Sequence, residues 1–386
     1  MKKGIVFLGV LLMAIQYSYT QVNEEIEPYA NFLRHEKTTA KEYILSLFKE
    51  KDIVILCERD HRELTQYDLI LDVMKDPYFI DNVGVVYTEV GAFNLNPELN
   101  RFLQNSHLSE EEINQQVLKF QRNCMFPLWE KSTFAYFIKG IYEINLSLPN
   151  EKKIQHFPTD IWYVEGKPDS VKVRSMLINM ANRDSIMAEQ IITLFDRQQK
   201  EMPRKKALVI MNYRHAFKQD TPSPNGIVSK NVGRFLQDRY ANKLANVMIN
   251  NFKEMPGAVV QDGKWDAAIQ NTHLEDVGFN FSESPFGNDN FDYWAGNTDL
   301  KYKNIFDGFV YYLPFEKWKI AKGLPGLMED GFYEEYAQRV FWFNKAVGRE
   351  IMPLQSKEEM QIYNNIHIND VEALDQMKEV IAKWLK

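Results

Sequence analysis

Four ionisable side chains, two glutamates and two histidines, stand where apolar runs of this sequence end. Glu58 and His61 follow the first run, Glu89 lies at the end of the second, and His215 follows the fourth. A buried carboxylate at a strand end is costly unless it is paired or placed in a cleft. A neighbouring carboxylate raises the pKa of an imidazole towards working pH, which suits a general base. The residue types therefore predict acid–base chemistry.

The runs that position these side chains have the pattern of buried strands. They are short and almost continuously apolar, as strands covered on both faces are, and they comprise residues 52–57, 83–90, 154–157, 207–211, 245–249 and 306–313. Helical periods separate most of them, notably at 171–199 and 228–240. Strands alternating with helices require crossover connections, so the sequence predicts an α/β fold with a mostly parallel sheet flanked by helices.

The carboxyl ends of parallel strands meet at one edge of a sheet, where ligands bind in open α/β folds. Glu58, His61, Glu89 and His215 are therefore expected to share one crevice, as the catalytic residues of a hydrolytic site. Three further polar residues at the same strand ends are predicted to contact the substrate, namely Asp160, Asn212 and Arg214.

The sequence predicts one domain over 21–386 with three additions to the sheet. A helical insertion is expected at about 96–150, where it could form a lid or a specificity wall. The region at about 256–303 is rich in Gly, Asn, Asp and aromatic residues without a clear period, which predicts a long ordered loop or small hairpin that walls a pocket. Helices at 334–386 are expected to cover the sheet or to form a dimer interface.

The amino terminus predicts export. Lys2 and Lys3 precede an apolar core at 5–15 that is too short to span a bilayer, which is typical of a signal peptide cleaved near residue 20. No later apolar stretch is long enough for a membrane span, so a periplasmic or extracellular product is expected.

Composition excludes several classes of protein. The chain has 386 residues, 45% of them hydrophobic, so it can bury a large core. A net charge of −7 without long Lys/Arg runs argues against nucleic acid as a partner and favours a small-molecule substrate. Two cysteines, Cys57 and Cys124, are too few for a disulfide framework, and Cys57 lies inside an apolar run.

Four motifs in order resemble the erythromycin-esterase-like superfamily, which includes ChaN-like haem-uptake lipoproteins. They are the turn Glu58-Arg59-Asp60-His61, the strand-end Glu89, the helical segment Arg183-Asp184-Ser185-Ile186-Met187-Ala188-Glu189-Gln190, and the strand end Asn212-Tyr213-Arg214-His215. With later matches the resemblance covers roughly 53–313. It implies an esterase-like hydrolase without a metal, in which His61 is the general base, Glu58 and Glu89 orient it, and His215 polarises the carbonyl or stabilises the oxyanion.

The sequence departs from the family pattern at three places. Cys57 and Arg62 stand where the family has glycines, and Ile70 falls near the position of an arginine found in macrolide esterases. Activity on macrolides is therefore not expected.

Two alternatives stay open. Glu58, His61, Glu89 and His215 are a reasonable ligand set for zinc, manganese or iron, and TIKI-type metalloproteases look like distant relatives. A ChaN-like protein would instead hold haem at a dimer face, through an axial ligand such as Tyr213, Tyr163 or His61, with the aromatic segment 279–294 as an apolar wall.

Overall fold

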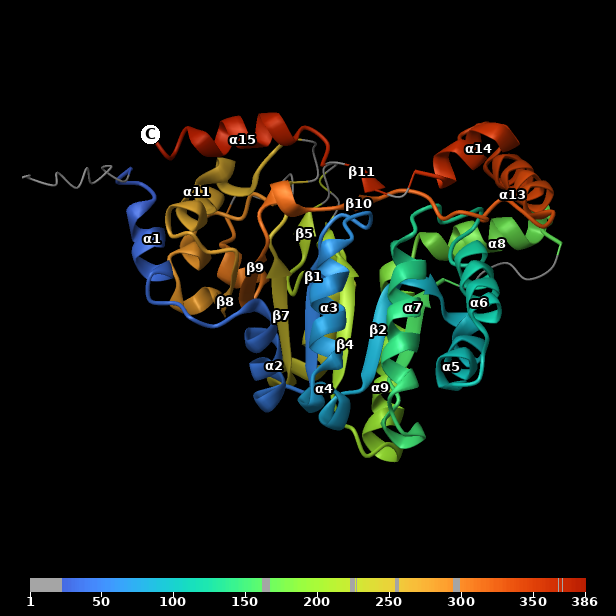
Figure 1. The fold of residues 1–386 in the computed structure, drawn as a ribbon, viewed down its shortest axis with the longest axis horizontal. Helices are drawn as coiled ribbons and strands as arrows, with labels where there is room; N and C mark the ends of the chain where they lie inside the picture. The colour runs from blue at the N-terminus through green and yellow to red at the C-terminus, as the bar shows by residue number, and fades with distance from the viewer. Residues whose placement is uncertain are drawn as a thin grey trace, which may run out of the picture.

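A seven-stranded sheet forms the centre of the molecule in this computed structural model, which describes residues 23–161, 167–222, 226, 228–253, 257–293, 299–366, 368–369 and 371–386 (Figure 1). The strands in sheet order are β3 (Gln155–Asp160), β2 (Val85–Ala92), β4 (Ala207–Asn212), β1 (Ile53–Glu58), β7 (Leu244–Ile249), β9 (Gly308–Tyr312) and β8 (Asp276–Asn280). All neighbours pair in parallel except β8 with β9. The prediction of an α/β fold with a mostly parallel sheet is confirmed.

Alternate residues of each strand feed two hydrophobic cores, one on each face of the sheet. In β1, Val54 and Leu56 pack in one core, whereas Ile53, Ile55 and Cys57 pack in the other. The first core contains side chains of α2 (Ala40–Glu50), α3 (Thr65–Lys75), α4 (Pro77–Asn82), α5 (Asn96–Gln104), α6 (Glu110–Arg122) and α7 (Thr133–Leu146). The second contains side chains of α1 (Glu27–Leu33), α9 (Arg183–Glu201), α10 (Val232–Tyr240), α11 (Lys264–Asn271), α12 (Tyr302–Ile305) and α15 (Leu374–Ala382). Burial on both faces explains why the strands read as continuous apolar runs.

The remaining elements lie towards the carboxyl edge of the sheet. Figure 1 shows α13 (Phe332–Val347) and α14 (Lys357–Asn364) beside α6 and α8 (Ser170–Met180), while α15 lies over α11. Two short antiparallel pairs complete the structure, β5 (Thr221–Pro222) with β6 (Val228–Ser229) and β10 (Ile320–Ala321) with β11 (Ile368–Asn369). The helical period predicted at 171–199 is divided between two helices, α8 and α9.

The aromatic region at 256–303 is not a long loop or a small hairpin, so that part of the prediction is wrong, although Gly278, Phe279 and Asn280 do line a cavity. The region contains α11, β8 and α12, and its rings pack around Trp265 in the core. Phe281 and Phe286 are 0% exposed and Tyr293 is 1% exposed. The strand β8 was missed because it is short and contains Gly278, where an added Cβ would lie 2.4 Å from the Cβ of Tyr43.

Two amide side chains of α5 cover the outer edge of β3, the edge strand next to β2. Asn100 donates to the carbonyl of His156 at 2.7 Å and accepts from the backbone N–H of the same residue at 3.0 Å. Asn96 donates to the carbonyl of Pro158 at 3.1 Å, and Pro158 has no N–H to satisfy. The outward backbone groups of His156 and Pro158 are therefore paired within the chain, which protects this part of the edge from pairing with another strand.

Replacing Asn100 by leucine is expected to lower the free energy of unfolding by about 2–4 kcal/mol, because both backbone groups of His156 lose their partner while staying buried. Urea denaturation measures the change. Asn82→Ala is the control, since Asn82 donates only to an exposed carbonyl. Equal stability of the two variants would show that the edge does not depend on the amide.

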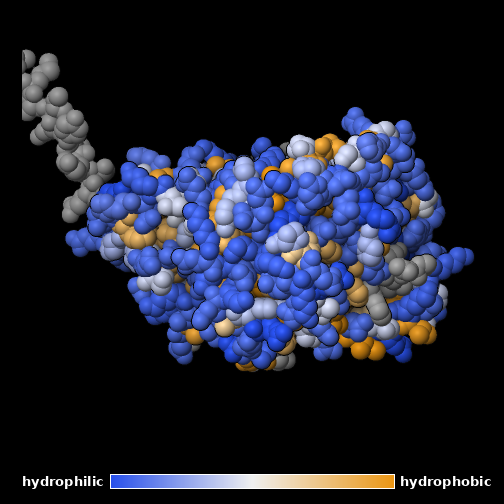
Figure 2. All heavy atoms as spheres, turned by 90° about the horizontal axis from the view of Figure 1, so that it is seen from below, coloured by the Kyte–Doolittle hydropathy of each residue, from blue (hydrophilic) through white to orange (hydrophobic). Residues whose placement is uncertain are grey.

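None of the helices in the described part of the chain is long and apolar enough to cross a membrane. Figure 2 shows a mainly hydrophilic face, on which hydrophobic residues lie in separate groups. Cys57 and Cys124 are free and buried. The predicted signal peptide at 1–20 lies outside the described residues.

Candidate active site

The carboxyl ends of β1, β2 and β4 bring the four predicted catalytic residues together. The Nδ1 atom of His61 lies 2.6 Å from Oε1 of Glu58. The Nε2 atoms of His61 and His215 each lie 3.7 Å from Oε1 of Glu89. Glu89 is therefore the common neighbour of the two imidazoles, and the four side chains form one cluster.

A bulge in β2 directs Glu89 towards the two histidines. Thr88 pairs with Pro158 of β3, but the next paired residue of β2 is Ala92, so the register shifts around Glu89. Gly91 has a φ of +104°, and an added Cβ there would lie 2.8 Å from the Cβ of Pro158. Bulges of this kind re-aim side chains next to functional sites.

Arg183, at the start of α9, is the centre of the site, and the sequence interpretation gave it no role. Its guanidinium donates to Oε1 of Glu89 at 2.9 Å and to Oδ1 of Asp160 at 2.7 Å. It also lies 3.3 Å from Nε2 of His215. The Arg-Asp pair that opens the long helical motif was the available signal. A helix that begins 94 residues after Glu89 could not be placed at the sheet edge from the sequence pattern alone.

Asp184 holds His215 from the other side. Its Oδ1 contacts Nδ1 of His215, and its Oδ2 lies 3.0 Å from Nη1 of Arg214. Because Arg183 can only donate, Nε2 of His215 accepts from it and Nδ1 carries the proton that Asp184 accepts. The contact with Arg183 is longer than an ordinary N–H···N or N–H···O bond, so the Nε2 lone pair is only weakly engaged.

His61 is a cation at neutral pH in this arrangement. Burial opposes the charge, but the Glu58 and Glu89 carboxylates overcome it and raise the pKa of His61 to about 10. Tyr67 donates to Oε2 of Glu58 at 2.8 Å and fixes that carboxylate. A permanently protonated imidazole can stabilise negative charge, but it is a poor base at pH 7.

Glu89 stays ionised although it is buried. Burial alone would raise its pKa, but the positive charges of Arg183 and His61 hold the pKa of Glu89 well below its ordinary value. The side chains of Glu58 and Glu89 are 1% and 4% exposed, whereas those of His61 and His215 are 18% and 14% exposed. The carboxylates thus form the floor of the site, and the imidazole edges face the space that a substrate can reach.

The helical segment expected at 96–150 contains α5, α6 and α7 and contributes a wall of the site. The ring of Trp129 meets the ring of His61 edge-on at 4.9 Å between centroids. Thr133, at the start of α7, donates to the carbonyl of His61 at 2.6 Å. This contact of Trp129 had no signal in the sequence, because the residues around it have no readable period.

The three residues predicted to contact substrate are placed differently from one another. Asp160 is 2% exposed and is committed to Arg183. The side chain of Asn212 donates to the carbonyl of Arg59 at 2.6 Å, so it ties β4 to the turn after β1. Arg214 is the most exposed of the three, at 32% for its side chain, and is the one placed to reach a ligand.

A metal ion does not fit this arrangement well. Glu58, His61 and Glu89 each offer one ligand atom within 4.8 Å of the others, whereas His215, expected as a fourth ligand, is outside this group among the described residues. The guanidinium of Arg183 already contacts Glu89. A divalent cation there would meet a fixed like charge at close range.

The haem ligands expected by analogy are poorly placed. The ring of Tyr213 stacks on Tyr293 at 5.0 Å between centroids, and both ring nitrogens of His61 face carboxylates. Tyr163 lies outside the described residues. The segment 279–294 was expected as an apolar wall, but its described aromatic rings are buried, and its exposed positions, such as Ser282 and Glu283, are polar.

No family model matches the chain, and no curated protein matches it in sequence. Several solved structures have a similar fold. One, a succinoglycan biosynthesis protein, is 11% identical, with 69% of this chain and 89% of that chain covered and a TM-score of 0.48. A mutant of the erythromycin esterase EreC in its open conformation is 13% identical, with 75% and 96% covered and a TM-score of 0.46.

The third structure, ChaN of Campylobacter jejuni with cofacially bound haem, is 12% identical, with 73% of this chain and 95% of that chain covered and a TM-score of 0.37. These similarities concern the outline of the fold. The roles of residues therefore follow from the geometry of this chain alone.

Proposed function

We propose that the protein is a hydrolase that cleaves an ester or a related carbonyl bond with activated water and without a metal. The observation that carries the proposal is the Asp184–His215 pair, in which Asp184 contacts Nδ1 while Nε2 lies 3.3 Å from the guanidinium of Arg183 in a side chain that is 14% exposed. An imidazole that is oriented through Nδ1 by a carboxylate and presents Nε2 to the substrate is the arrangement of a general base.

The geometry supports a reversal of the roles that the family resemblance implied for the two histidines. Nε2 of His215 takes a proton from water as the water oxygen attacks the carbonyl carbon. The His61 imidazolium and the Arg183 guanidinium stabilise the resulting oxyanion. When the tetrahedral intermediate collapses, the leaving alkoxide takes the proton from His215, and an acid and an alcohol are released.

We also propose that the protein is exported from the cytoplasm. The positive residues and short apolar core at 1–20 support it, as does the acidic run Glu24, Glu25 and Glu27 that follows. A small-molecule ester outside the cytoplasm is then the expected substrate.

Hydrolysis of a panel of alkyl and aryl esters, measured after treatment of the purified protein with EDTA and dialysis, tests the proposal. At least one ester is expected to be hydrolysed at a rate that chelation does not change, because no step uses a metal. Loss of the activity on chelation and its return with zinc or manganese would favour the metal-dependent alternative. Folded protein that hydrolyses no member of the panel, and that holds haem through gel filtration, would favour the binding alternative.

A further inference from the structure

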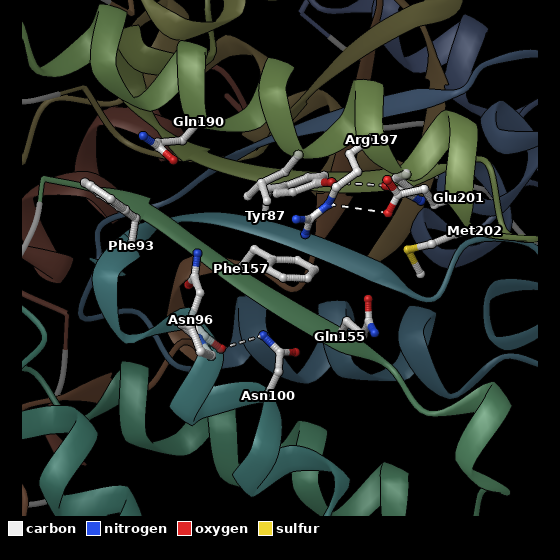
Figure 3. A pocket seen from close by; sticks show the side chains of 13 residues that line it. Tyr87, Phe93, Asn96, Asn100, Gln155, Phe157, Gln190, Arg197, Glu201 and Met202 are labelled. Atoms are coloured by element: carbon white, nitrogen blue, oxygen red, sulfur yellow. Dashed lines mark hydrogen bonds and ion pairs between the residues drawn. The ribbon is translucent and has the colours of Figure 1, made fainter.

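A cavity of about 540 Å³ lies between α9 and the edge strand β3, outside the catalytic residues (Figure 3). Its volume is in the range of small-molecule sites. Gln190 and Phe93 lie at one end, and Arg197, Glu201 and Met202 lie at the other, with Phe157 between them. The cavity therefore offers an apolar centre with polar groups at both ends.

The centre of the cavity is an aromatic face. The ring of Phe157 is only partly buried and stacks on the buried ring of Tyr87, with centroids 5.8 Å apart and planes 29° apart. Tyr87 donates its hydroxyl to Gln198 at 3.0 Å, so the ring beneath Phe157 is fixed. A fixed, accessible aromatic face accepts the C–H groups of a saturated ring by dispersion and weak C–H···π contact.

The polar groups of the cavity suit a neutral ligand that both donates and accepts hydrogen bonds. Within the described part of the chain, the amides of Gln155 and Gln190 have no hydrogen-bonding partner. An amide offers one acceptor and two donors, which matches a hydroxyl group that does both. The two charged residues, Arg197 and Glu201, oppose one another at 3.9 Å, so the cavity has no net charge to attract an anion or a cation.

We propose that this cavity binds a neutral sugar residue, with its ring against Phe157 and its hydroxyls on Gln155 and Gln190. A phosphorylated or strongly ionic ligand does not fit, because the charges of the cavity cancel. A flat aromatic compound would use Phe157 but leave both amides unsatisfied.

The cavity is also close enough to the catalytic residues to hold part of their substrate. Phe157 is three residues before Asp160 on β3, which is about 10 Å along a strand. Gln190 is seven residues after Arg183 on α9, which is about 10 Å along a helix. If the proposed hydrolase function holds, its substrate is then an ester that carries a glycosyl group. The sugar binding itself does not depend on hydrolysis.

Saturation-transfer NMR and calorimetry with methyl pyranosides of glucose, galactose, mannose, rhamnose and N-acetylglucosamine test the binding directly. We expect at least one sugar to bind with a Kd of about 1 mM. Gln190→Ala and Phe157→Leu are expected to weaken it at least about tenfold, a loss of about 1.4 kcal/mol. Glu189→Ala, at an exposed position of the same helix, is the control and should bind as the wild type does.

The same titration on His215→Ala protein separates this proposal from the hydrolase function. If the wild type hydrolyses no member of the ester panel while His215→Ala protein binds sugar as the wild type does, the hydrolase function is overturned and the sugar site stands. If none of the sugars binds at about 50 mM, roughly fifty times the expected Kd, the sugar site is overturned. Binding that Gln190→Ala and Phe157→Leu leave intact would do the same, as would preference for indole over every sugar.

A glycosylated ester tests the connection between the two sites. We expect kcat/KM for an ester of a methyl glycoside to exceed that for the matching methyl ester, and Gln190→Ala to remove the difference. Equal use of both esters by the wild type would show that the cavity does not serve the catalytic residues.

Discussion

Replacing His215 by alanine is expected to lower kcat/KM for ester hydrolysis by about 10³-fold, the usual contribution of a positioned general base. The physical reason is that no other described nitrogen at the site is both oriented by a carboxylate and weakly engaged. His61 does not substitute, because its pKa of about 10 keeps it protonated at neutral pH. Steady-state kinetics on the best ester of the panel measures the loss.

Two further variants make the His215 result specific. Asp184→Asn should also lower kcat, because Nδ1 of His215 loses the acceptor that holds its tautomer. His107→Ala, at an exposed position after α5, should keep the wild-type rate. More than half of the activity remaining in His215→Ala would rule out this residue as the base.

Replacing Arg183 by methionine is expected to lower the free energy of unfolding by about 3–5 kcal/mol, as breaking a buried ion pair does. Glu89 and Asp160 are 3% and 2% exposed, and both would lose the guanidinium that neutralises them. Urea denaturation at pH 7 measures the change, and hydrolysis should be lost as well.

The control for this prediction is a second replacement in the same background. Glu89→Gln together with Arg183→Met removes one of the two unpaired charges, so the double variant should be more stable than Arg183→Met alone. Arg183→Lys should be intermediate, since a lysine keeps the charge but not the fork that bonds two carboxylates at once. A loss below about 1 kcal/mol in Arg183→Met would contradict the view that these carboxylates are buried as charges.

The sheet could be predicted from the sequence because its strands are covered on both faces. Each such strand is a compact apolar run, and the alternation with helices implies parallel pairing. The antiparallel strand β8 has no such signal: it is five residues long, and Gly278 lies at its centre under Tyr43. The aromatic rings at 279–293 were expected to line a ligand site, but they fill the core. Composition does not distinguish the two cases, because it does not show which side of a ring is covered.

The site could be predicted in part, for a related reason. Glu58, Glu89 and His215 belong to strand ends, and parallel strands deliver their ends to one edge. Arg183 and Asp184 begin a helix, and the sequence does not show that the amino end of α9 reaches the same edge. The protonation states could not be predicted from the sequence, since they depend on distances such as the 2.6 Å between Nδ1 of His61 and Oε1 of Glu58.

The pH dependence of kcat/KM tests the central claim, that His61 acts as a cation beside a separate base. Below its pKa of about 10, His61 is mainly in the imidazolium form. We therefore expect kcat/KM to be steady between pH 8 and 9, about one to two units below that pKa, and to fall above about pH 10. Uncatalysed hydrolysis is subtracted, and circular dichroism at each pH shows that the fold is kept. A rate that instead rises tenfold per pH unit up to about 10 would mean that deprotonated His61 is the base, and it would contradict the account.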